Sequence, residues 1–591
     1  MTLFLLSGFS QNSEDLIPKD ALIVFSIHDF SEIKELPLNE LMSYAFMSEL
    51  EQEQYDGSTH KKKIKDAGLN LNQKMSVFSG KTNNYSISGV TFGLSNKEKL
   101  FEVFDDFDDE ESIYEGYELY SSYFNKLFIK SGCALLIRLE CNEQKINELT
   151  DSIWNAKGYL NKLKDDNVKN DTKNTFDWVE SNEFEELEEK GYLELRDSVQ
   201  LALHDKYEKI IIDELIIDGK NLIKSDKNFE EQINHQTDGS VYFDNSRNAM
   251  GIWNKYNFSK NAFGEIESIY KNSKTVGDLS FVNNGLELNL TSSYSEKMGL
   301  VYSELNKTKL NKSIRNYIPQ DMAAFFIYKI NLEAAYEKMV ETLLPILRKQ
   351  TNIKITRGVI MFDILNEFIN KEALFKAYQG SVFATFNGTE KIKTDKIEHE
   401  YNEETFEYTE VISKKEELMP LFTIGVCSEN KNLLSKIFNS VSKLDPLLKK
   451  KDNYWRYEDA IMSAAPLYFF HEKNIFFITN DSKMIHDNRN GYEKPLISKK
   501  EIRDINNGGA IYFKSNLEQS ISQIPSSLFP SKEAEFISFI KNGHGNVQFL
   551  SNLTKDNQTR YKLIYNCDEN KKNKGVHLLD LINAIYLFTN N

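Results

Sequence analysis

Residues 16–27 read LIPKDALIVFSI, and residues 317–330 read YIPQDMAAFFIYKI. In each stretch an Ile-Pro pair is followed by an aspartate two residues after the proline (Asp20 and Asp321) and then by a short apolar run. Proline cannot donate to a sheet ladder, so it belongs just before a strand, and such a run fits a strand buried on both faces. The chain therefore contains two similar segments, and Ile318 lies 301 positions after Ile17.

Further landmarks recur in the same order along the chain. The tripeptide SVF occurs at 76–78 and 381–383, and a strand, glycine and amphipathic helix pattern at 90–104 recurs at 422–438, which aligns Gly93 with Gly425. GSVYFDNS at 239–246 matches GAIYFKSN at 509–516. Polar residues at 95–96 and 428–430 fit helix N-caps. These ordered matches predict an internal duplication.

The pattern predicts an α+β fold with two sequence-related halves in a pseudo-twofold arrangement, each a largely antiparallel sheet with packed helices. We expect a first repeat at 16–310, with a charged insertion at about 145–235, and a second repeat at 311–591. A second insertion at about 388–417 alternates polar and apolar residues, which indicates a long exposed hairpin or a mobile loop. A groove between the halves would be a natural place for a ligand.

Composition and charge narrow the function classes. The 591 residues are 40% hydrophobic, 27% charged and 12% aromatic, values that are typical of a folded protein with several domains. The formal net charge of −17 argues against nucleic acid or an anionic membrane surface as a partner, although an acidic total can hide a basic patch. No apolar run reaches the length of about 20 residues that a transmembrane helix requires.

The four cysteines, Cys133, Cys141, Cys427 and Cys567, form no CxxC pair and no metal-ligand spacing. We therefore expect no disulfide scaffold and no structural zinc site. The apolar surroundings of Cys133 and Cys427 favour buried thiols. The sequence is also compatible with one long-range disulfide.

The first 15 residues, MTLFLLSGFSQNSED, begin apolar and turn polar, with Gly8 and Ser10 placed as small residues ahead of Gln11. This resembles the hydrophobic region and cleavage site of a secretory signal, but the basic region is missing. The interpretation is a signal-peptide remnant, and it predicts an exported protein of the periplasm or cell envelope.

The Ile-Pro-x-Asp openings, each followed by a strand, and the ordered duplication resemble a family of exported bacterial proteins of unknown function, typical of Bacteroidetes-type bacteria and often lipoproteins. The resemblance covers most of the chain and implies export. This sequence departs from the lipoprotein form because no cysteine lies near its start. The family offers no catalytic residue to transfer.

Several short motifs resemble catalytic or ligand-binding motifs, but each has a simpler structural explanation. GKT at 80–82 lacks the earlier glycine of a phosphate-binding loop, because position 75 is Met, so a turn is favoured. The acidic run at 105–112 lacks the glycine of a calcium loop, and the glutamate-rich stretch at 176–189 reads as a solvated helix. Among the scattered histidines, His28 aligns with Lys329, His471 falls in a hairpin and His544 falls in a loop. The sequence therefore predicts no catalytic, cofactor-binding or metal-ligating residue and no cofactor.

Three functional hypotheses remain open. The first is a non-enzymatic exported envelope protein that acts as a binding or scaffold module for another envelope protein or an unidentified ligand. The alternatives are an envelope hydrolase with a site between the halves, and a carrier of an apolar ligand. A scaffold should expose a large apolar patch, an enzyme should gather titratable groups in a pocket, and a carrier should enclose an apolar cavity.

Overall fold

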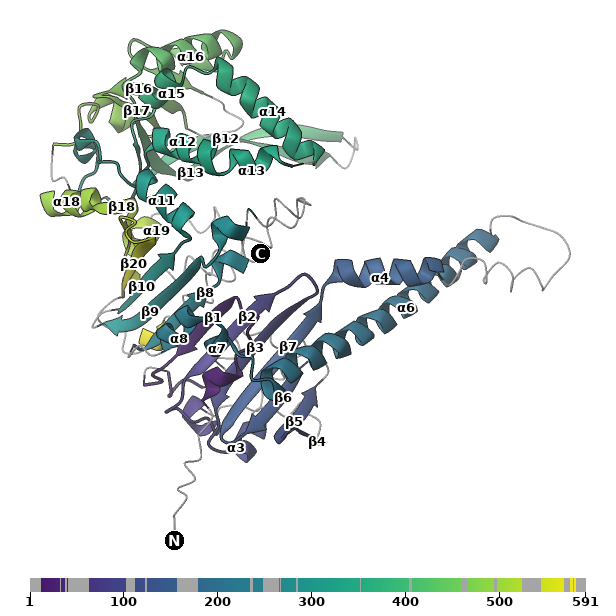
Figure 1. The fold of residues 1–591 in the computed structure, drawn as a ribbon. Coiled ribbons are helices and arrows are strands. Elements are labelled where there is room, and N and C mark those ends of the chain that lie inside the picture. The colour runs from purple at the N-terminus through teal and green to yellow at the C-terminus, as the bar shows by residue number, and fades with distance from the viewer. Residues whose placement is uncertain are drawn as a thin grey trace. The chain divides into compact units, whose positions relative to one another are not determined.

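The chain forms two compact units, residues 1–251 and 252–591 (Figure 1). This computed structural model describes residues 12–31, 33–37, 40, 63–102, 112–122, 125–156, 179–233, 237–247, 265, 267–282, 285–320, 322–350, 352–402, 407–458, 465–493, 497–522, 544–567, 574–577 and 579–580. The predicted signal remnant at 1–15 lies outside them up to residue 11, and so do most of the acidic run at 105–112 and Asp321.

Unit 1 combines an antiparallel sheet with helices. Its sheet order is β8-β1-β2-β3-β7-β6-β5-β4, and every neighbouring pair is antiparallel. The strands are β1 (Ile23–Ile27), β2 (Met75–Lys81), β3 (Tyr85–Gly93), β4 (Ser112–Tyr114), β5 (Tyr117–Ser122), β6 (Asn125–Lys130), β7 (Cys133–Cys141) and β8 (Gly239–Phe243).

The helices of unit 1 include most of the predicted charged insertion. They are η1 (Ser13–Leu16), η2 (Ile64–Asp66), α3 (Lys97–Phe101), α4 (Glu143–Ala156), α6 (Val179–Ile212) with a π-helical turn η3 (Asp213–Ile217), α7 (Leu222–Ser225) and α8 (Lys227–Ile233). Figure 1 shows the long helix α6 running beside the sheet with α4 against it. The glutamate-rich stretch at 176–189 is helical from Val179, and its side chains lie outside the described part of the chain.

Unit 2 contains a longer antiparallel sheet, in the order β14-β15-β16-β17-β13-β12-β11-β18-β19-β20-β10-β9. Its strands are β9 (Lys274–Val282), β10 (Gly285–Ser293), β11 (Ala324–Lys329), β12 (Ser381–Asn402), β13 (Glu407–Cys427), β14 (Leu448–Lys450), β15 (Trp455–Tyr457), β16 (Leu467–Glu472), β17 (Ile475–Thr479), β18 (Gly508–Asn516), β19 (His544–Asn552) and β20 (Gln558–Cys567). Strands β12 and β13 form a long hairpin across the second predicted insertion.

The helices of unit 2 lie in the connections between its strands. They are α11 (Glu296–Leu305), η4 (Lys312–Tyr317), α12 (Leu332–Thr342), α13 (Leu344–Arg348), α14 (Ile353–Phe368), α15 (Lys371–Ala377), α16 (Lys431–Leu444), α17 (Ser482–His486), α18 (Lys499–Asn507) and α19 (Leu517–Ser522). The mixture of helices and wholly antiparallel ladders confirms the predicted α+β class.

The eight strands of unit 1 and eight strands of unit 2 pair in corresponding orders, β8-β1-β2-β3-β7-β6-β5-β4 and β18-β11-β12-β13-β17-β16-β15-β14. The compact units divide at 251/252 and not at the expected repeat boundary of 310/311, because β10 pairs with β20 of unit 2 and carries β9 with it. An origin by duplication stays a prediction.

The Ile-Pro segments are buried anchors in both units. Ile17 and Ile318 are fully buried, and their carbonyls accept hydrogen bonds from Leu222 N (2.9 Å) and Ile497 N (3.1 Å). A segment about 200 residues downstream thus fixes each motif through the isoleucine carbonyl, a contact that does not require an N–H from the proline that follows.

Two-residue turns close the hairpins that the sequence pattern indicated. Ser131 and Gly132 between β6 and β7 both have positive φ (51° and 80°), as do Lys473 and Asn474 between β16 and β17 (46° and 60°). Such turns match the right-handed twist of the flanking strands.

A phenylalanine covers a glycine of the adjacent strand in each sheet. Phe78 of β2 lies opposite Gly89 of β3, and Phe383 of β12 lies opposite Gly425 of β13. The predicted alignment of Gly93 with Gly425 is therefore wrong in the strand register, because the glycine under the ring in unit 1 is Gly89. A Cβ at position 89 would lie 2.5 Å from the Phe78 ring and 2.5 Å from the Leu136 carbonyl oxygen.

Gly89→Val should lower the free energy of unfolding by about 3 kcal/mol, because the new side chain overlaps a buried ring and a backbone carbonyl. Urea unfolding followed by circular dichroism measures the loss. The matched control is Gly358→Ala in α14, where a Cβ meets no atom within 4 Å, and it should raise helix stability by about 0.5–1 kcal/mol. Equal urea midpoints for Gly89→Val and the wild type would contradict the ring-on-glycine packing.

Candidate functional site

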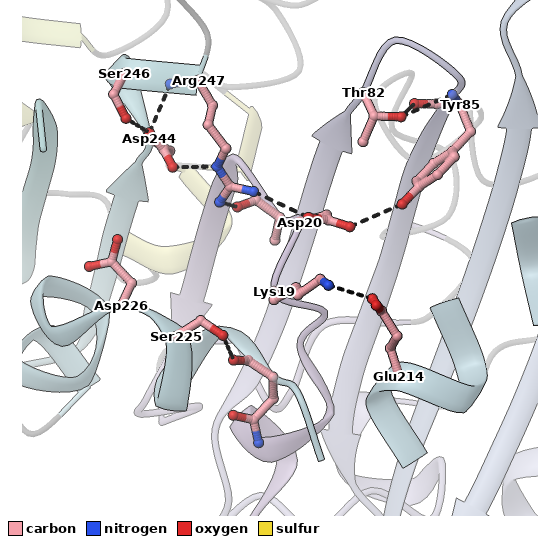
Figure 2. A network of polar contacts seen from close by, with 12 residues as sticks. Lys19, Asp20, Thr82, Tyr85, Glu214, Ser225, Asp226, Asp244, Ser246 and Arg247 are labelled. Carbon is pink, nitrogen blue, oxygen red and sulfur yellow. Dashed lines mark hydrogen bonds and ion pairs between the residues drawn. The ribbon is translucent and has the colours of Figure 1, made fainter. Parts of the chain in front are cut away.

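A network of charged and hydroxyl side chains surrounds the first Ile-Pro-x-Asp segment (Figure 2). Arg247 places its Nε 2.5 Å from Asp244 and its Nη1 3.6 Å from Asp20, and it donates from Nη2 to the Ala21 carbonyl at 2.9 Å. The Tyr85 hydroxyl donates to the other oxygen of Asp20 at 3.0 Å. Arg247 thus ties the segment after β8 to the segment before β1.

The neighbouring groups of this network are also paired. Lys19 forms an ion pair of 2.6 Å with Glu214, and the buried Tyr242 donates to Asp226 at 2.9 Å. Burial, followed by the Asp20 carboxylate, raises the pKa of Tyr85, so this phenol stays a proton donor at neutral pH. Each charge faces a fixed partner, and the arrangement suits a structural clamp better than a reacting centre.

The GKT motif lies at the end of a strand. Gly80 and Lys81 are the last residues of β2, and Thr82 begins the turn to β3, where its hydroxyl donates to the Tyr85 carbonyl at 3.1 Å. A Cβ at Gly80 would strike the Asp20 carbonyl oxygen, so this glycine is required by the contact with the Ile-Pro-x-Asp segment. The turn predicted at this motif therefore begins only at Thr82, because Gly80 and Lys81 belong to the strand.

Two of the histidines considered in the sequence, His28 and His471, contact backbone and hydroxyl groups that hold the fold. The His28 ring contacts the Thr237 carbonyl (3.0 Å) and the Ser240 hydroxyl (2.9 Å), while His471 contacts the Ser428 carbonyl at 2.9 Å. His544 is the first residue of β19 and not part of a loop, which corrects the sequence-based assignment.

The cysteines and carboxylates assemble no metal site in the part of the chain that the structure describes. All four cysteines are free thiols, and Cys133, Cys427 and Cys567 are buried. Burial, followed by the charge of Glu14, raises the pKa of Cys133 to about 11, which leaves it protonated and unreactive. No helix within the described ranges is apolar over enough residues to span a membrane.

Lys329 is a buried cation that the sequence pattern did not single out. Its side chain is 1% exposed, and its ammonium donates to the carbonyls of Ile505 (2.5 Å) and Gly508 (3.2 Å) at the end of α18. A cation is favourable at a helix C-terminus, where carbonyls have no intrahelical donor. The expected alignment with His28 is wrong, because Lys329 faces Ser381 as Ser26 faces Ser76.

The feature with the clearest binding potential is the outward face of α14. Asn352 caps the helix by accepting from Lys354 N and Ile355 N, Val359 is buried, and Phe362 meets Tyr336 at a ring distance of 6.3 Å. The opposite face carries large apolar side chains in solvent, with Phe368 at 83% exposure. These side chains are Ile353, Ile360, Met361, Ile364, Leu365 and Phe368. We call this set the α14 apolar face.

The spacing explains why these residues form one surface. Positions 360, 361, 364, 365 and 368 follow the three-to-four-residue repeat that places side chains on one side of a helix. Apolar periodicity in the sequence indicates the helix, but the chain also has apolar residues on the inward side at 359 and 362, so periodicity alone does not say which side is covered.

A second exposed apolar stripe lies on α16. Ile437, Val441 and Leu444 are exposed at helical spacing, with Leu444 at 86%, while Phe438 points inward against Trp455 at a ring distance of 5.4 Å. Figure 1 shows α14, α15 and α16 at the same end of unit 2. Between α15 and the start of α16 lies an open polar hollow lined by Asn370, Glu372, Ala373, Lys376, Glu429 and Asn430.

Comparisons with known proteins give no family. No family model matches the chain, and no curated protein matches it. Solved structures with similarity include crystal forms III, IV and I of the treponemal protein TP0453, at 7–11% identity and TM-scores of 0.21–0.23, covering 50–52% of this chain and 84–85% of theirs. TM-scores this far below 0.5 support no conclusion about the present chain.

The buried ammonium predicts a pH dependence of stability. Desolvation lowers the pKa of Lys329 to about 8 in the folded chain, whereas the unfolded side chain keeps a pKa near 10.5. The unfolded state therefore binds more protons between these values, and stability rises with pH. From pH 8 to about 9.5 the contribution of Lys329 should increase by about 1.5 kcal/mol.

Urea unfolding at several pH values measures this slope against Lys329→Met, which has no titrating group and should lose the increase. The comparison of slopes is independent of any overall destabilisation in the variant. An unchanged slope in Lys329→Met would show that another group titrates.

Proposed function

We propose that the chain is a non-enzymatic exported protein of the cell envelope and that it binds a partner through the α14 apolar face. The observation that carries the proposal is the exposure of six large apolar side chains on one helix face. Exposed apolar patches of this kind are uncommon on monomers and mark interaction sites.

The inward side of α14 supports the same interpretation. Val359 is buried, the Tyr336 hydroxyl donates to Asn366, and Arg348 pairs with Asp363 at 2.7 Å. These contacts hold the helix on unit 2 without help from the outward residues, so folding does not require Ile364 or Phe368 to be apolar.

The polar features argue in the same direction. The network of Asp20, Asp244 and Arg247 satisfies its own charges, and the tyrosine beside it has a raised pKa, which disfavours a general base there. The hollow beside α15 is polar and open, unlike the enclosed apolar cavity that a carrier needs.

The proposal predicts export and a contact at Phe368 in the native setting. Fractionation of the producing cells with mass spectrometry of the N-terminus should find the chain in the envelope or periplasmic fraction, beginning near Gln11. A photo-crosslinking residue at position 368 should give an adduct, while the same residue at Ile113, which is 76% exposed in unit 1, should give none.

An intact N-terminus in the cytosolic fraction would overturn the localisation. Equal labelling at positions 368 and 113 would remove the assignment of the α14 apolar face as the binding surface.

A further inference from the structure

We infer that the exposed faces of α14 and α16 bind the surface of an anionic lipid bilayer. This rests on the proposed function and names the chemistry of what the α14 apolar face contacts. Two separate helices of unit 2 carry the same combination of exposed apolar and basic side chains, and that combination is what an interfacial membrane helix presents.

The first helix lies in a locally basic segment of an acidic chain. From residue 342 to residue 362 the sequence contains Arg348, Lys349, Lys354 and Arg357 and no aspartate or glutamate, although the whole chain has a net charge of −17. Lys354 and Arg357 are exposed on the first turns of α14, beside the α14 apolar face, and no described acidic side chain pairs with them. The acids of this helix are Glu367, which is exposed, and Asp363, which pairs with Arg348 at 2.7 Å. Lys349 pairs with Glu265, so Lys354 and Arg357 are the basic residues on which the inference rests.

The second helix repeats the pattern independently. The segment from 431 to 451 contains six lysines (Lys431, Lys436, Lys443, Lys449, Lys450 and Lys451) and a single acid, Asp445. On α16 the exposed stripe of Ile437, Val441 and Leu444 is accompanied by the exposed Lys436 and Lys443. The basic patch that the net charge conceals is therefore present, which revises the expectation drawn from the charge of the whole chain.

The charge pattern favours a lipid surface over a second copy of this chain. A twofold dimer uses the same patch on both subunits, so it would bring lysines and arginines of one copy against those of the other. Like charges that face each other disfavour association. An anionic bilayer offers both phosphate groups for the basic residues and an apolar boundary for Ile364, Leu365 and Phe368.

The magnitudes suit reversible binding. A leucine, isoleucine or phenylalanine side chain gains roughly 1.5–3 kcal/mol when fully removed from water, and partial insertion gains less. Each basic residue near an anionic leaflet adds about 1 kcal/mol, and salt weakens that contribution. Loss of either the apolar or the basic residues should thus weaken binding.

Flotation of the full chain with vesicles tests the inference. We expect binding to phosphatidylcholine vesicles that contain about 30% phosphatidylglycerol, little binding to pure phosphatidylcholine, and loss in about 0.5 M salt. Ile364→Ser/Phe368→Ser and Lys354→Glu/Arg357→Glu should each lower the bound fraction about tenfold or more.

Matched controls lie outside the two helices. Leu201→Ser/Ile113→Ser removes two comparably exposed apolar side chains from unit 1, and Lys297→Glu/Lys555→Glu reverses two exposed lysines of unit 2. Both control variants should bind vesicles like the wild type, and circular dichroism checks that every variant is folded.

Three outcomes would overturn the inference: no binding to anionic vesicles by the folded chain, equal binding by the α14 variants, or self-association without vesicles that Ile364→Ser/Phe368→Ser abolishes. The last result would assign the face to a second copy. A failure of vesicle binding does not change the expected export or the expected adduct at position 368. It is therefore distinguishable from a failure of the proposed function.

Discussion

A phenylalanine ring lying on a glycine of the adjacent strand is the contact on which both sheets depend. Phe78 over Gly89 and Phe383 over Gly425 sit at the junction of β2 with β3 and of β12 with β13, and both rings are almost fully buried. A shift of one residue would move each ring to the other face of its sheet. The Ile-Pro segments lead into β1 and β11, which pair with β2 and β12 on one side and with β8 and β18 on the other, in the register that the ring and glycine mark.

The sequence was sufficient for the fold class, the hairpin turns and the N-cap at Asn96, because these follow from local patterns: alternation, two polar turn residues and a side-chain acceptor before a helix. It was insufficient for pairings set by distant contacts. Gly93 and Gly89 are both strand glycines of β3, and only the partner ring in β2 distinguishes them. The unit boundary likewise depends on β10 pairing with β20, which are far apart in the chain.

The absence of a predicted site residue and the failure to foresee the exposed apolar face of α14 have a common physical explanation. Catalytic groups can be recognised in a sequence by residue type and spacing, whereas a binding face is made of ordinary isoleucine, leucine and phenylalanine residues. Periodicity reveals that α14 is an apolar helix, but exposure depends on which side meets the sheet, and Val359 and Phe362 take the inward positions. Lys329 was hidden in the same way, since its partners are backbone carbonyls about 175 residues away.

Exposed apolar residues on α14 have a cost that folding does not offset. Each leaves its surface in water, and a polar residue at 364 or 368 would keep the caps and inward contacts of the helix. On α16 the contrast is sharper, since Phe438 packs among Trp455 and Phe469 while Leu444 on the other side lies in solvent. Two helices that each bury one apolar face and expose another, with basic residues beside the exposed one, fit the proposed binding surface, which is both apolar and negatively charged.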